Sequence, residues 1–288
     1  MFTAKAHALL VPFDGSFDAQ AAATTPGKSK NAWKEQLEAE VKALADSQYR
    51  LFADGRYAVL LVFQALDAAG KDSAIRHVFA GVNPCGLHVT AFKQPSRREL
   101  AHDFLWRTTA PLPERGHVAV FNRSYYEEVL VVRVHPELLA AQRASPRPSA
   151  SFWEDRLRAI RDHERHLAEQ GTVILKFWLN ISRDEQRKQL LERIDEPAKN
   201  WKFNVGDLDE RARWDDYLAA YDACLNATSR PWAPWYAVPA DNKHFLRLTV
   251  AKIVNEALAS LELDFPRADA AARAALAAAR KRLLAERE

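Results

Sequence analysis

Residues 57–66 (YAVLLVFQAL) form a run that is almost entirely apolar and rich in β-branched and aromatic side chains. An apolar run without alternation is typical of a strand that is covered on both faces, as strands are in a parallel sheet. A strand with one face in water would instead alternate apolar and polar residues. This segment therefore predicts a central strand of an α/β protein, and it constrains the fold more than any other part of the chain.

Strand-like and helix-like segments alternate along the rest of the sequence. Further strands are predicted at residues 87–92, 117–121, 172–179 and 235–238. Helices are predicted at residues 31–52, 72–79, 97–108, 125–142, 152–169, 182–193, 207–225, 242–263 and, in the tail, 266–288. Alternation of this kind builds βαβ units. The expected fold class is therefore α/β with three layers, in which a five-stranded, mostly parallel sheet carries helices on both faces.

The composition is that of a folded protein with a large core. Of the 288 residues, 48% are hydrophobic, which excludes disorder of the whole chain. We expect an arm that is loosely held to about residue 27, followed by a helix that ends at residue 52. The main domain is expected at residues 53–265, and an Ala- and Arg-rich helix at 266–288 closes the chain.

Charge, cysteine content and hydropathy exclude several functional classes. The 41 Lys and Arg residues against 38 Asp and Glu residues give a net charge of +3, which argues against a dedicated duplex-DNA binder. Cys85 and Cys224 have neither CxxC nor Cys/His metal spacing, which argues against a disulfide scaffold and a zinc module. The sequence has no apolar run of about 18 residues and no signal-peptide layout, so we expect no membrane partner and a cytoplasmic location.

Directly after the central strand, residues 65–73 read ALDAAGKDS and open a helix. Small residues let backbone N–H groups curl around a phosphate, the helix N-terminus adds a positive dipole, and Lys71 adds a full charge. These are the properties of a P-loop, although Ala65 replaces its first Gly and Asp72 its Ser/Thr. The predicted phosphate ligands are Ala68, Ala69, Gly70, Lys71, Asp72 and Ser73. The alternative is an ordinary strand-to-helix turn.

Asp67 is an acid inside this phosphate cradle, where it would repel an anion. Its presence is explained if it holds a divalent cation or takes a proton from an attacking oxygen. The alternative is that Asp67 caps the following helix.

A second polar cluster, NRSYYEE, follows the predicted strand at residues 117–121. Asn122 takes the place at which P-loop enzymes hold Mg²⁺ with an acid, and Arg123 can form a bidentate fork to phosphate. Glu127 is expected to reach the same mouth of the sheet. The alternative for Ser124 and Glu127 is a capping box at a helix N-terminus, and the two interpretations are compatible.

An insert with basic and aromatic residues lies between the fourth and fifth predicted strands, where P-loop phosphotransferases carry a lid. We expect this lid at about residues 182–227, and its alternative is a solvated pair of helices. Its candidate phosphate or nucleotide ligands are Arg183, Lys199 and Lys202. The aromatic residues are spaced by three and four and are more typical of a core: Trp214, Tyr217 and Tyr221. Three other cations are either surface charges or phosphate contacts: Arg76, Lys93 and Arg133.

Together these motifs resemble polyphosphate kinase family 2. The family motif G-x-D-A-x-G-K-x-G corresponds to residues 65–73, and [D/N]-R-S-x-Y to residues 122–126. The lid motif I-x-x-P-x-K-x-W-K begins at Ile194, and A-P-W-Y-x-V-x-A-D-x-K corresponds to residues 233–243. The resemblance covers about residues 52–263 and implies a P-loop kinase-like fold with a helical lid. With Asn122 at the first position of the second motif, the chain resembles the subgroup that has Asn there rather than Asp. Members of that subgroup use both AMP and ADP.

The resemblance implies phosphoryl transfer, with Mg²⁺ or Mn²⁺, between inorganic polyphosphate and a nucleotide: AMP, ADP or ATP, with GMP and GDP as further candidates. It implies that the chemistry involves Asp67, Lys71, Asn122, Arg123 and Arg183. Metal ligands are implied at Asp67 and Glu127, and Arg76 joins the loop residues in holding polyphosphate. Nucleotide contacts are implied at Lys93, Asn122, Glu127, Arg133, Lys199 and Lys202. Relatives imply a homodimer or homotetramer.

Three other interpretations stay open. The first is an ATP-dependent small-molecule kinase on the same fold. The second is a binding module for single-stranded nucleic acid, which the near-neutral charge and the acid at Asp67 disfavour. The third is a degenerate structural relative, which the substitution at Ala65 suggests. The joint retention of four residues argues against it: Asp67, Lys71, Arg123 and Arg183.

Overall fold

The computed structural model describes residues 1–27, 33–142 and 151–286. Its sheet has five strands in the order β2-β3-β1-β4-β5, and every neighbouring pair is parallel. The strands are β1 (Ala58–Gln64), β2 (Leu87–Ala91), β3 (Val118–Asn122), β4 (Thr172–Asn180) and β5 (Trp235–Pro239). The predicted α/β class and all the predicted strands are confirmed.

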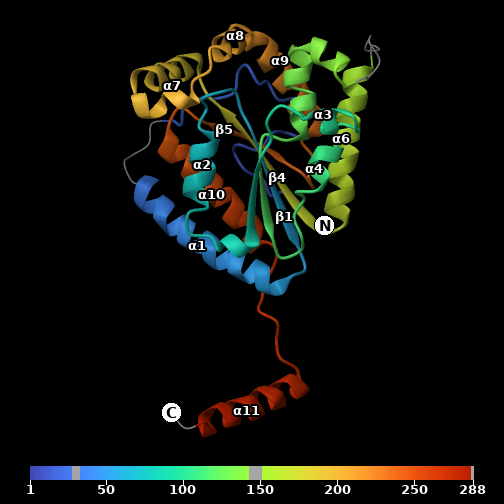
Figure 1. Ribbon diagram of the computed structural model, residues 1–288, viewed down its shortest axis with the longest axis vertical. Helices are drawn as coiled ribbons and strands as arrows, with labels where there is room; N and C mark the ends of the chain where they lie inside the picture. The colour runs from blue at the N-terminus through green and yellow to red at the C-terminus, as the bar shows by residue number, and fades with distance from the viewer. Residues whose placement is uncertain (28–32, 143–150, 287–288) are drawn as a thin grey trace.

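Helices cover both faces of the sheet, as predicted. In Figure 1, α1 (Trp33–Asp54), α2 (Lys71–Val78) and α10 (Lys243–Ala259) lie on one side of the strands, and α6 (Phe152–Glu169) lies on the other. Above the ends of the strands lie α7 (Arg183–Asp195), α8 (Gly206–Ala212) and α9 (Trp214–Thr228). The start predicted for α1, at residues 31 and 32, lies outside the described residues.

The central strand β1 has the environment that its composition predicts. All of its residues are buried, and it pairs with β3 on one side and β4 on the other. Val59, Leu61 and Phe63 pack into the cluster that β1 shares with α1, α2 and α10. Leu60 and Val62 pack into the cluster that includes α6 and α9. Successive side chains of β1 therefore alternate between two apolar clusters, one on each face of the sheet. Both faces require apolar residues, and the run is uninterrupted for that reason.

Three segments that were each predicted as one continuous helix are divided into shorter helices, so these predictions are wrong in part. Residues 97–108 divide into α3 (Arg97–Leu100) and α4 (Trp106–Thr109), and the Asp103 carboxylate accepts a hydrogen bond from the Leu105 N–H in the turn between them. Residues 125–142 divide into η2 (Tyr125–Glu128), α5 (Val131–Val134) and η3 (Pro136–Ala140). Pro136 has no N–H and forces the residue before it out of the helical region, which ends α5. Residues 207–225 divide at Arg213 into α8 and α9.

The N-terminal arm is not loosely held, so that expectation is wrong. Val11 is fully buried, its N–H donates to the Trp235 carbonyl at 2.9 Å, and the Ala237 N–H donates to the Leu9 carbonyl at 2.9 Å. The arm therefore extends the sheet along the outer side of β5, antiparallel at Leu10. Backbone hydrogen bonds of this kind need no side-chain pattern, which is why the sequence does not indicate them.

Two further segments complete the chain. The short helix η1 (Pro84–Gly86) precedes β2, and η4 (Pro197–Lys202) joins α7 to α8. The predicted C-terminal helix exists as α11 (Ala270–Ala285), with no buried residue, and Figure 1 shows it apart from the body. No helix within the described ranges is long and apolar enough to cross a membrane.

A buried ion pair joins the layer of α6 to the sheet. Lys176 of β4 and Glu164 of α6 are both fully buried, with 2.5 Å between Lys176 Nζ and Glu164 Oε2. The Tyr126 hydroxyl donates to Glu164 Oε1 at 2.7 Å and accepts from Lys176 Nζ at 2.9 Å. Burial lowers the pKa of the Lys176 ammonium, and the Glu164 carboxylate opposes that shift. Because Tyr126 follows the polar end of β3, this network fixes the segment that starts at Asn122.

Removing one partner of this pair destabilises the protein more than removing both. We expect Lys176→Met to lower the free energy of unfolding by about 3–5 kcal/mol, because it leaves the Glu164 carboxylate buried without a cation. The double variant Lys176→Met/Glu164→Leu replaces the pair by apolar groups and is expected to lose much less. Urea unfolding followed by circular dichroism measures both. Equal losses in the single and double variants would contradict this account of the pair.

Candidate active site

The loop between β1 and α2 has the backbone of a phosphate cradle. It runs through residues 65–70 and contains two residues in the left-handed region, Ala68 at φ 64° and Gly70 at φ 91°. Gly70 is the N-cap of α2, and no side chain accepts a capping hydrogen bond there. The first N–H groups of the helix therefore face the loop without a side-chain acceptor from the N-cap residue. Left-handed geometry at Gly70 explains why glycine is needed there. Asp67 is not that cap, so its alternative interpretation is wrong.

Lys71 folds back into this cradle. Its ammonium donates to the Ala65 carbonyl at 2.8 Å and to the Leu66 carbonyl at 3.4 Å, and the residue is only 9% exposed. Burial, and then the positive charge of Arg123, lower the pKa of Lys71 to about 8. The hydrogen-bond acceptors of the ammonium are thus neutral carbonyl groups. A phosphate anion at this place would form stronger, charge-assisted hydrogen bonds with it.

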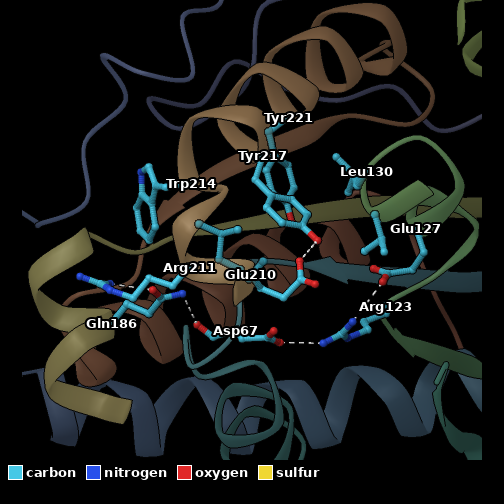
Figure 2. A pocket seen from close by; sticks show the side chains of 13 residues that line it. Asp67, Arg123, Glu127, Leu130, Gln186, Glu210, Arg211, Trp214, Tyr217 and Tyr221 are labelled. Atoms are coloured by element: carbon cyan, nitrogen blue, oxygen red, sulfur yellow. Dashed lines mark hydrogen bonds and ion pairs between the residues drawn. The ribbon is translucent and has the colours of Figure 1, made fainter. Parts of the chain in front are cut away.

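Arg123 connects the two strand ends at the mouth of the sheet (Figure 2). Its Nη2 donates to Asp67 Oδ1 at 2.7 Å, and its Nη1 donates to Glu127 Oε2 at 3.1 Å. The Arg123 N–H extends the β1–β3 pairing to the Phe63 carbonyl, and its φ of 63° then turns the chain out of the sheet. The Glu127 and Asp67 carboxylates raise the pKa of the Arg123 guanidinium, so it remains charged.

Glu127 faces this site and does not complete a capping box. Its Oε1 accepts from Gln64 Nε2 at 2.8 Å, and its Oε2 accepts from Arg123. Ser124 does cap, but its hydroxyl accepts from the Tyr126 N–H rather than the Glu127 N–H. The capping-box interpretation is therefore wrong for Glu127, whereas Ser124 fits the capping interpretation.

Asn122 and Asp72 are brought together although they lie in different motifs. Asn122 Nδ2 donates to Asp72 Oδ1 at 2.5 Å, so the end of β3 is tied to the first turn of α2. This hydrogen bond requires an amide at residue 122. An ionised carboxylate at the same position would have no proton to donate to Asp72.

Side chains of the segment after β4 lie over this site and line a pocket with it. Figure 2 shows Asp67, Arg123 and Glu127 on its floor, with Tyr217 and Tyr221 above them. Trp214, Tyr217 and Tyr221 are buried, which confirms their prediction as core residues, and they also line the pocket. Burial raises the pKa of the Tyr217 hydroxyl.

Several predicted ligands lie outside this pocket. Arg183 stacks its guanidinium over Trp214, with 5.6 Å between Cζ and the ring centroid. Lys199 pairs with Glu192 and Glu196, and Lys202 lies over the exposed ring of Trp201. Arg133 lies over Trp153, and Arg76 and Lys93 are exposed. The structure therefore gathers Asp67, Lys71, Asn122, Arg123 and Glu127, but not these cations.

Three polar residues of the pocket were missed by the sequence analysis: Gln186, Glu210 and Arg211. Gln186 Nε2 donates to the Asp67 carbonyl at 3.0 Å, and Arg211 Nη1 donates to Gln186 Oε1 at 2.8 Å. Glu210 accepts from the Tyr217 hydroxyl at 2.5 Å and contacts His135 at 3.0 Å. No motif marks these residues, and only their place in the predicted lid could have indicated them.

The donor set at the floor of the pocket fits a hard divalent cation. Asp67 Oδ2 has no hydrogen-bond partner among the described residues, whereas Oδ1 is held by Arg123. A Mg²⁺-like ion is usually held by one or two carboxylates, with substrate phosphates and water completing its shell. Within the part of the chain that the structure describes, no group of three acidic, His or Cys side chains forms a complete metal site. A metal here would therefore share its ligands with a bound phosphate.

The charge distribution of the site suits a phosphorylated ligand. Positive charge comes from the loop amides, Lys71, Arg123 and Arg211, and aromatic side chains line the pocket beside them. The acids at Asp67 and Glu127 set the orientation of Arg123 and offer oxygen ligands. Such a combination of groups can stabilise charge during group transfer without a covalent nucleophile.

Comparison with known proteins places this chain in a family. The model of the family "Polyphosphate kinase 2 (PPK2)" matches residues 27–266. An ADP-polyphosphate phosphotransferase of Rhodopseudomonas palustris is 54% identical over 260 residues, covering 89% of this chain and 90% of that protein. An AMP/ADP-polyphosphate phosphotransferase of Meiothermus ruber is 46% identical over 242 residues, covering 84% of this chain and 87% of that protein.

A solved structure supports the same assignment over nearly the whole chain. The crystal structure of polyphosphate kinase 2 from Arthrobacter aurescens TC1 superposes with a TM-score of 0.85 at 42% identity, covering 96% of this chain and 98% of that one. The P-loop kinase-like fold predicted from the sequence is confirmed by this likeness. The chain belongs to the polyphosphate kinase 2 family.

Proposed function

We propose that this enzyme transfers the terminal phosphoryl group of inorganic polyphosphate to AMP or ADP, and that it runs in both directions. The observation that carries the proposal is the position of Arg123. Its guanidinium lies between Asp67 and Glu127, at the mouth of the cradle that holds Lys71. The chain's membership of the polyphosphate kinase 2 family and the names of the chain's relatives support polyphosphate as one substrate and AMP or ADP as the other.

The phosphate cradle is the binding site for the polyphosphate donor in this proposal. The loop amides of residues 68–71 and the Lys71 ammonium neutralise the end of the chain, and the nucleotide enters from the side of Glu127 and Tyr217. Both substrates are anions, so their approach requires positive charge between them. Arg123 supplies it, because its guanidinium lies between the loop and Glu127 and can bind oxygens of the moving phosphoryl group.

No strong general base is required, because the attacking group is already an ionised phosphate oxygen. The task of Asp67 is then to orient Arg123 through Oδ1 and to offer Oδ2 to a metal ion. We propose Mg²⁺, with Mn²⁺ as a substitute, held by Asp67 and Glu127 together with substrate phosphates. When bound, the metal neutralises charge on the bridging phosphates.

We propose that the moving part of the lid is shorter than the predicted residues 182–227. α9 packs seven buried residues into the core, whereas η4 and α8 bury none and α7 buries only Gln186 and Leu190. We propose that residues 183–212 close over the substrates. Closure would change the position of Arg183, which now stacks on Trp214.

The remaining features of the proposal follow the family. We propose a homodimer or homotetramer in the cytoplasm, with no nucleic-acid or membrane partner. The alternative of an ATP-dependent small-molecule kinase on the same fold is not favoured by the names of the relatives.

The direct test is an assay of the purified chain with polyphosphate, Mg²⁺ and either AMP or ADP, followed by the appearance of ADP or ATP. The proposal predicts nucleotide formation that stops when polyphosphate is omitted. Phosphorylation of a small molecule with ATP as donor, and none with polyphosphate, would support the alternative kinase.

Asp67→Asn keeps the shape of the side chain and removes its charge. We expect turnover to fall by about a hundredfold or more, because Arg123 loses its orienting ion pair and the metal loses a ligand. The unfolding temperature should change little, since Asp67 is about one-third exposed. Asp184→Asn, on the exposed side of α7, is the matched control and should retain activity. Unchanged turnover in Asp67→Asn would remove the role assigned to Asp67.

Lys71 should make polyphosphate binding depend on pH near 8. The pKa of Lys71 is lowered to about 8 by burial, so the ammonium loses its proton as the pH rises through this value. A bound phosphate stabilises the charged form, so binding takes up a proton and the KM for polyphosphate rises above pH 8. Calorimetry in buffers of different ionisation enthalpy measures this uptake. In Lys71→Arg the charge persists, so an identical pH dependence there would contradict the assignment.

Asn122→Asp should change the preference between AMP and ADP. The carboxylate of the variant cannot donate to Asp72 and repels it, so the end of β3 separates from α2. We expect the ratio of kcat/KM for the two acceptors to shift by about tenfold. The double variant Asp72→Asn/Asn122→Asp restores the hydrogen bond with its donor and acceptor exchanged, and should restore the ratio. An unaltered ratio in the single variant would show that Asn122 does not affect acceptor choice.

A further inference from the structure

A third carboxylate lines the active-site pocket, and its surroundings differ from those of the other two. Asp67 and Glu127 are both paired with Arg123, whereas Glu210 lies on α8. Figure 2 shows Glu210 facing the same space, where it accepts from the Tyr217 hydroxyl at 2.5 Å. A hydroxyl carries no charge that offsets a carboxylate, and a nucleotide brings further negative charge into this pocket. The charge of Glu210 therefore opposes nucleotide binding unless a cation neutralises it.

His135, which follows α5, is in a position to neutralise Glu210. Its Nε2 lies 3.0 Å from each oxygen of the Glu210 carboxylate, and its Nδ1 lies 3.2 Å from Oε1 of Glu137 in η3. The side chain of His135 is 16% exposed and that of Glu210 35%, so water screens their attraction only in part. Arg211, the other cation near Glu210 on α8, donates instead to the neutral side chain of Gln186.

The two contacts of His135 depend on the protonation of its ring. Each ring nitrogen faces a carboxylate, and only the imidazolium carries a proton on both nitrogens. A neutral ring keeps one of these protons and turns the lone pair of its other nitrogen toward a carboxylate oxygen. Histidine is the side chain that ordinarily makes this change near neutral pH. Both contacts together therefore require the charged ring.

The other groups around His135 include one cation and one neutral donor. Arg213, between α8 and α9, has Nη1 3.5 Å from the Val134 carbonyl, and its charge opposes protonation of the ring. The pKa of Glu137 is lowered by its own backbone N–H, and then by His135 and Arg213, so Glu137 is ionised at neutral pH. Burial and the Glu210 carboxylate raise the pKa of Tyr217, which stays a neutral donor. The carboxylates of Glu137 and Glu210 thus favour the charged ring, and Arg213 alone opposes it among these groups.

The contact with His135 also holds α8 in place. α8 buries none of its residues, so apolar packing does little to fix it. Glu210 belongs to the part of the lid that we propose to move, whereas His135 and Tyr217 belong to the body. The hydrogen bonds of Glu210 therefore join the lid to the body on the nucleotide side of the pocket.

We propose that His135 is a positioning residue for the nucleotide: it neutralises Glu210 and holds α8 against the body, so that nucleotide affinity falls when the ring loses its proton. This inference rests on the proposed function, because it takes AMP or ADP as the occupant of this side of the pocket. His135 acts through Glu210 and needs no contact with the nucleotide. With the ring neutral, the Glu210 carboxylate repels the nucleotide phosphates and α8 is held less firmly.

A purely structural role for His135 makes a different prediction. If the ring only joins α8 to the body, then His135→Gln and Glu210→Gln disturb the same contact, and both weaken nucleotide binding. If the ring neutralises Glu210, then Glu210→Gln removes the charge that needs neutralising. The amide of that variant still accepts from the Tyr217 hydroxyl, so nucleotide binding is not weakened.

The test measures the KM for AMP and for ADP between about pH 6 and about pH 8.5, at saturating polyphosphate. The proteins are wild type, His135→Gln, Glu210→Gln and the double variant, with His166→Gln, at an exposed position of α6, as the matched control. Calorimetry of ADP binding without polyphosphate is run in parallel, because it requires no turnover. The ionisation of the nucleotide is common to all variants, so the differences between their pH profiles carry the result. Circular dichroism and unfolding temperatures verify the fold.

We expect His135→Gln to raise the nucleotide KM about fivefold at the acid end of this range and much less at the alkaline end, where the wild-type ring is neutral. The kcat value and the pH dependence of the KM for polyphosphate should stay close to those of wild type. In the Glu210→Gln background, His135→Gln should have no further effect. His166→Gln should behave as wild type.

Two results would overturn the inference. One is a pH profile of nucleotide affinity that is the same in wild type and His135→Gln. The other is a loss of affinity in Glu210→Gln equal to that in His135→Gln, which is the result of a structural role. Failure of the wild type to use polyphosphate, with ADP binding that still depends on pH through His135, would contradict the proposed function and leave this inference standing.

Discussion

The two ion pairs of Arg123 are the interaction on which the site depends. β1 and β3 are neighbours in the sheet, and each ends in a polar segment that turns away from it. Asp67 comes from the segment after β1, whereas Arg123 and Glu127 come from the segment after β3. Their ion pairs therefore lock two loops to each other at the edge where open α/β sheets bind ligands. Together with the hydrogen bond from Asn122 to Asp72, this contact sets the position of the loop after β1 relative to the segment after β3.

The core supports this contact from below. The segment that carries Arg123 and Glu127 continues into Tyr125 and Tyr126, whose hydroxyls donate to the buried Glu164. Lys176 compensates that carboxylate in turn and lies on β4, on the other side of β1. A buried charge network with every member satisfied allows only one arrangement of its partners. The left-handed turn at Arg123 is thus held by hydrogen bonds on its inner side and by carboxylates on its outer side.

Much of the fold was predictable because the strands carry strong local signals. The apolar run of β1, the order of the βαβ units and the loop before Lys71 follow from residue type and spacing alone. The site residues at the strand ends, Asp67, Asn122, Arg123 and Glu127, were predictable for the same reason, since the topology brings carboxyl ends of parallel strands to one edge. The arm was not predictable, because its contacts at Leu9 and Val11 are backbone hydrogen bonds. Nor were Gln186, which donates to the Asp67 carbonyl, and Arg211, which donates to Gln186, because these contacts arise only from the packing of α7 and α8.

The measurement that tests the central claim most directly is a crystal structure with a non-hydrolysable polyphosphate analogue, in which carbon replaces the bridging oxygens. The account predicts a terminal phosphonate in the loop of residues 65–71, with Lys71 Nζ released from the Ala65 carbonyl and bound to a phosphonate oxygen. It also predicts that Arg123 retains Asp67 and donates its remaining N–H groups to the same ligand. Analogue bound elsewhere, with Lys71 still on the Ala65 carbonyl and the loop empty, would contradict it.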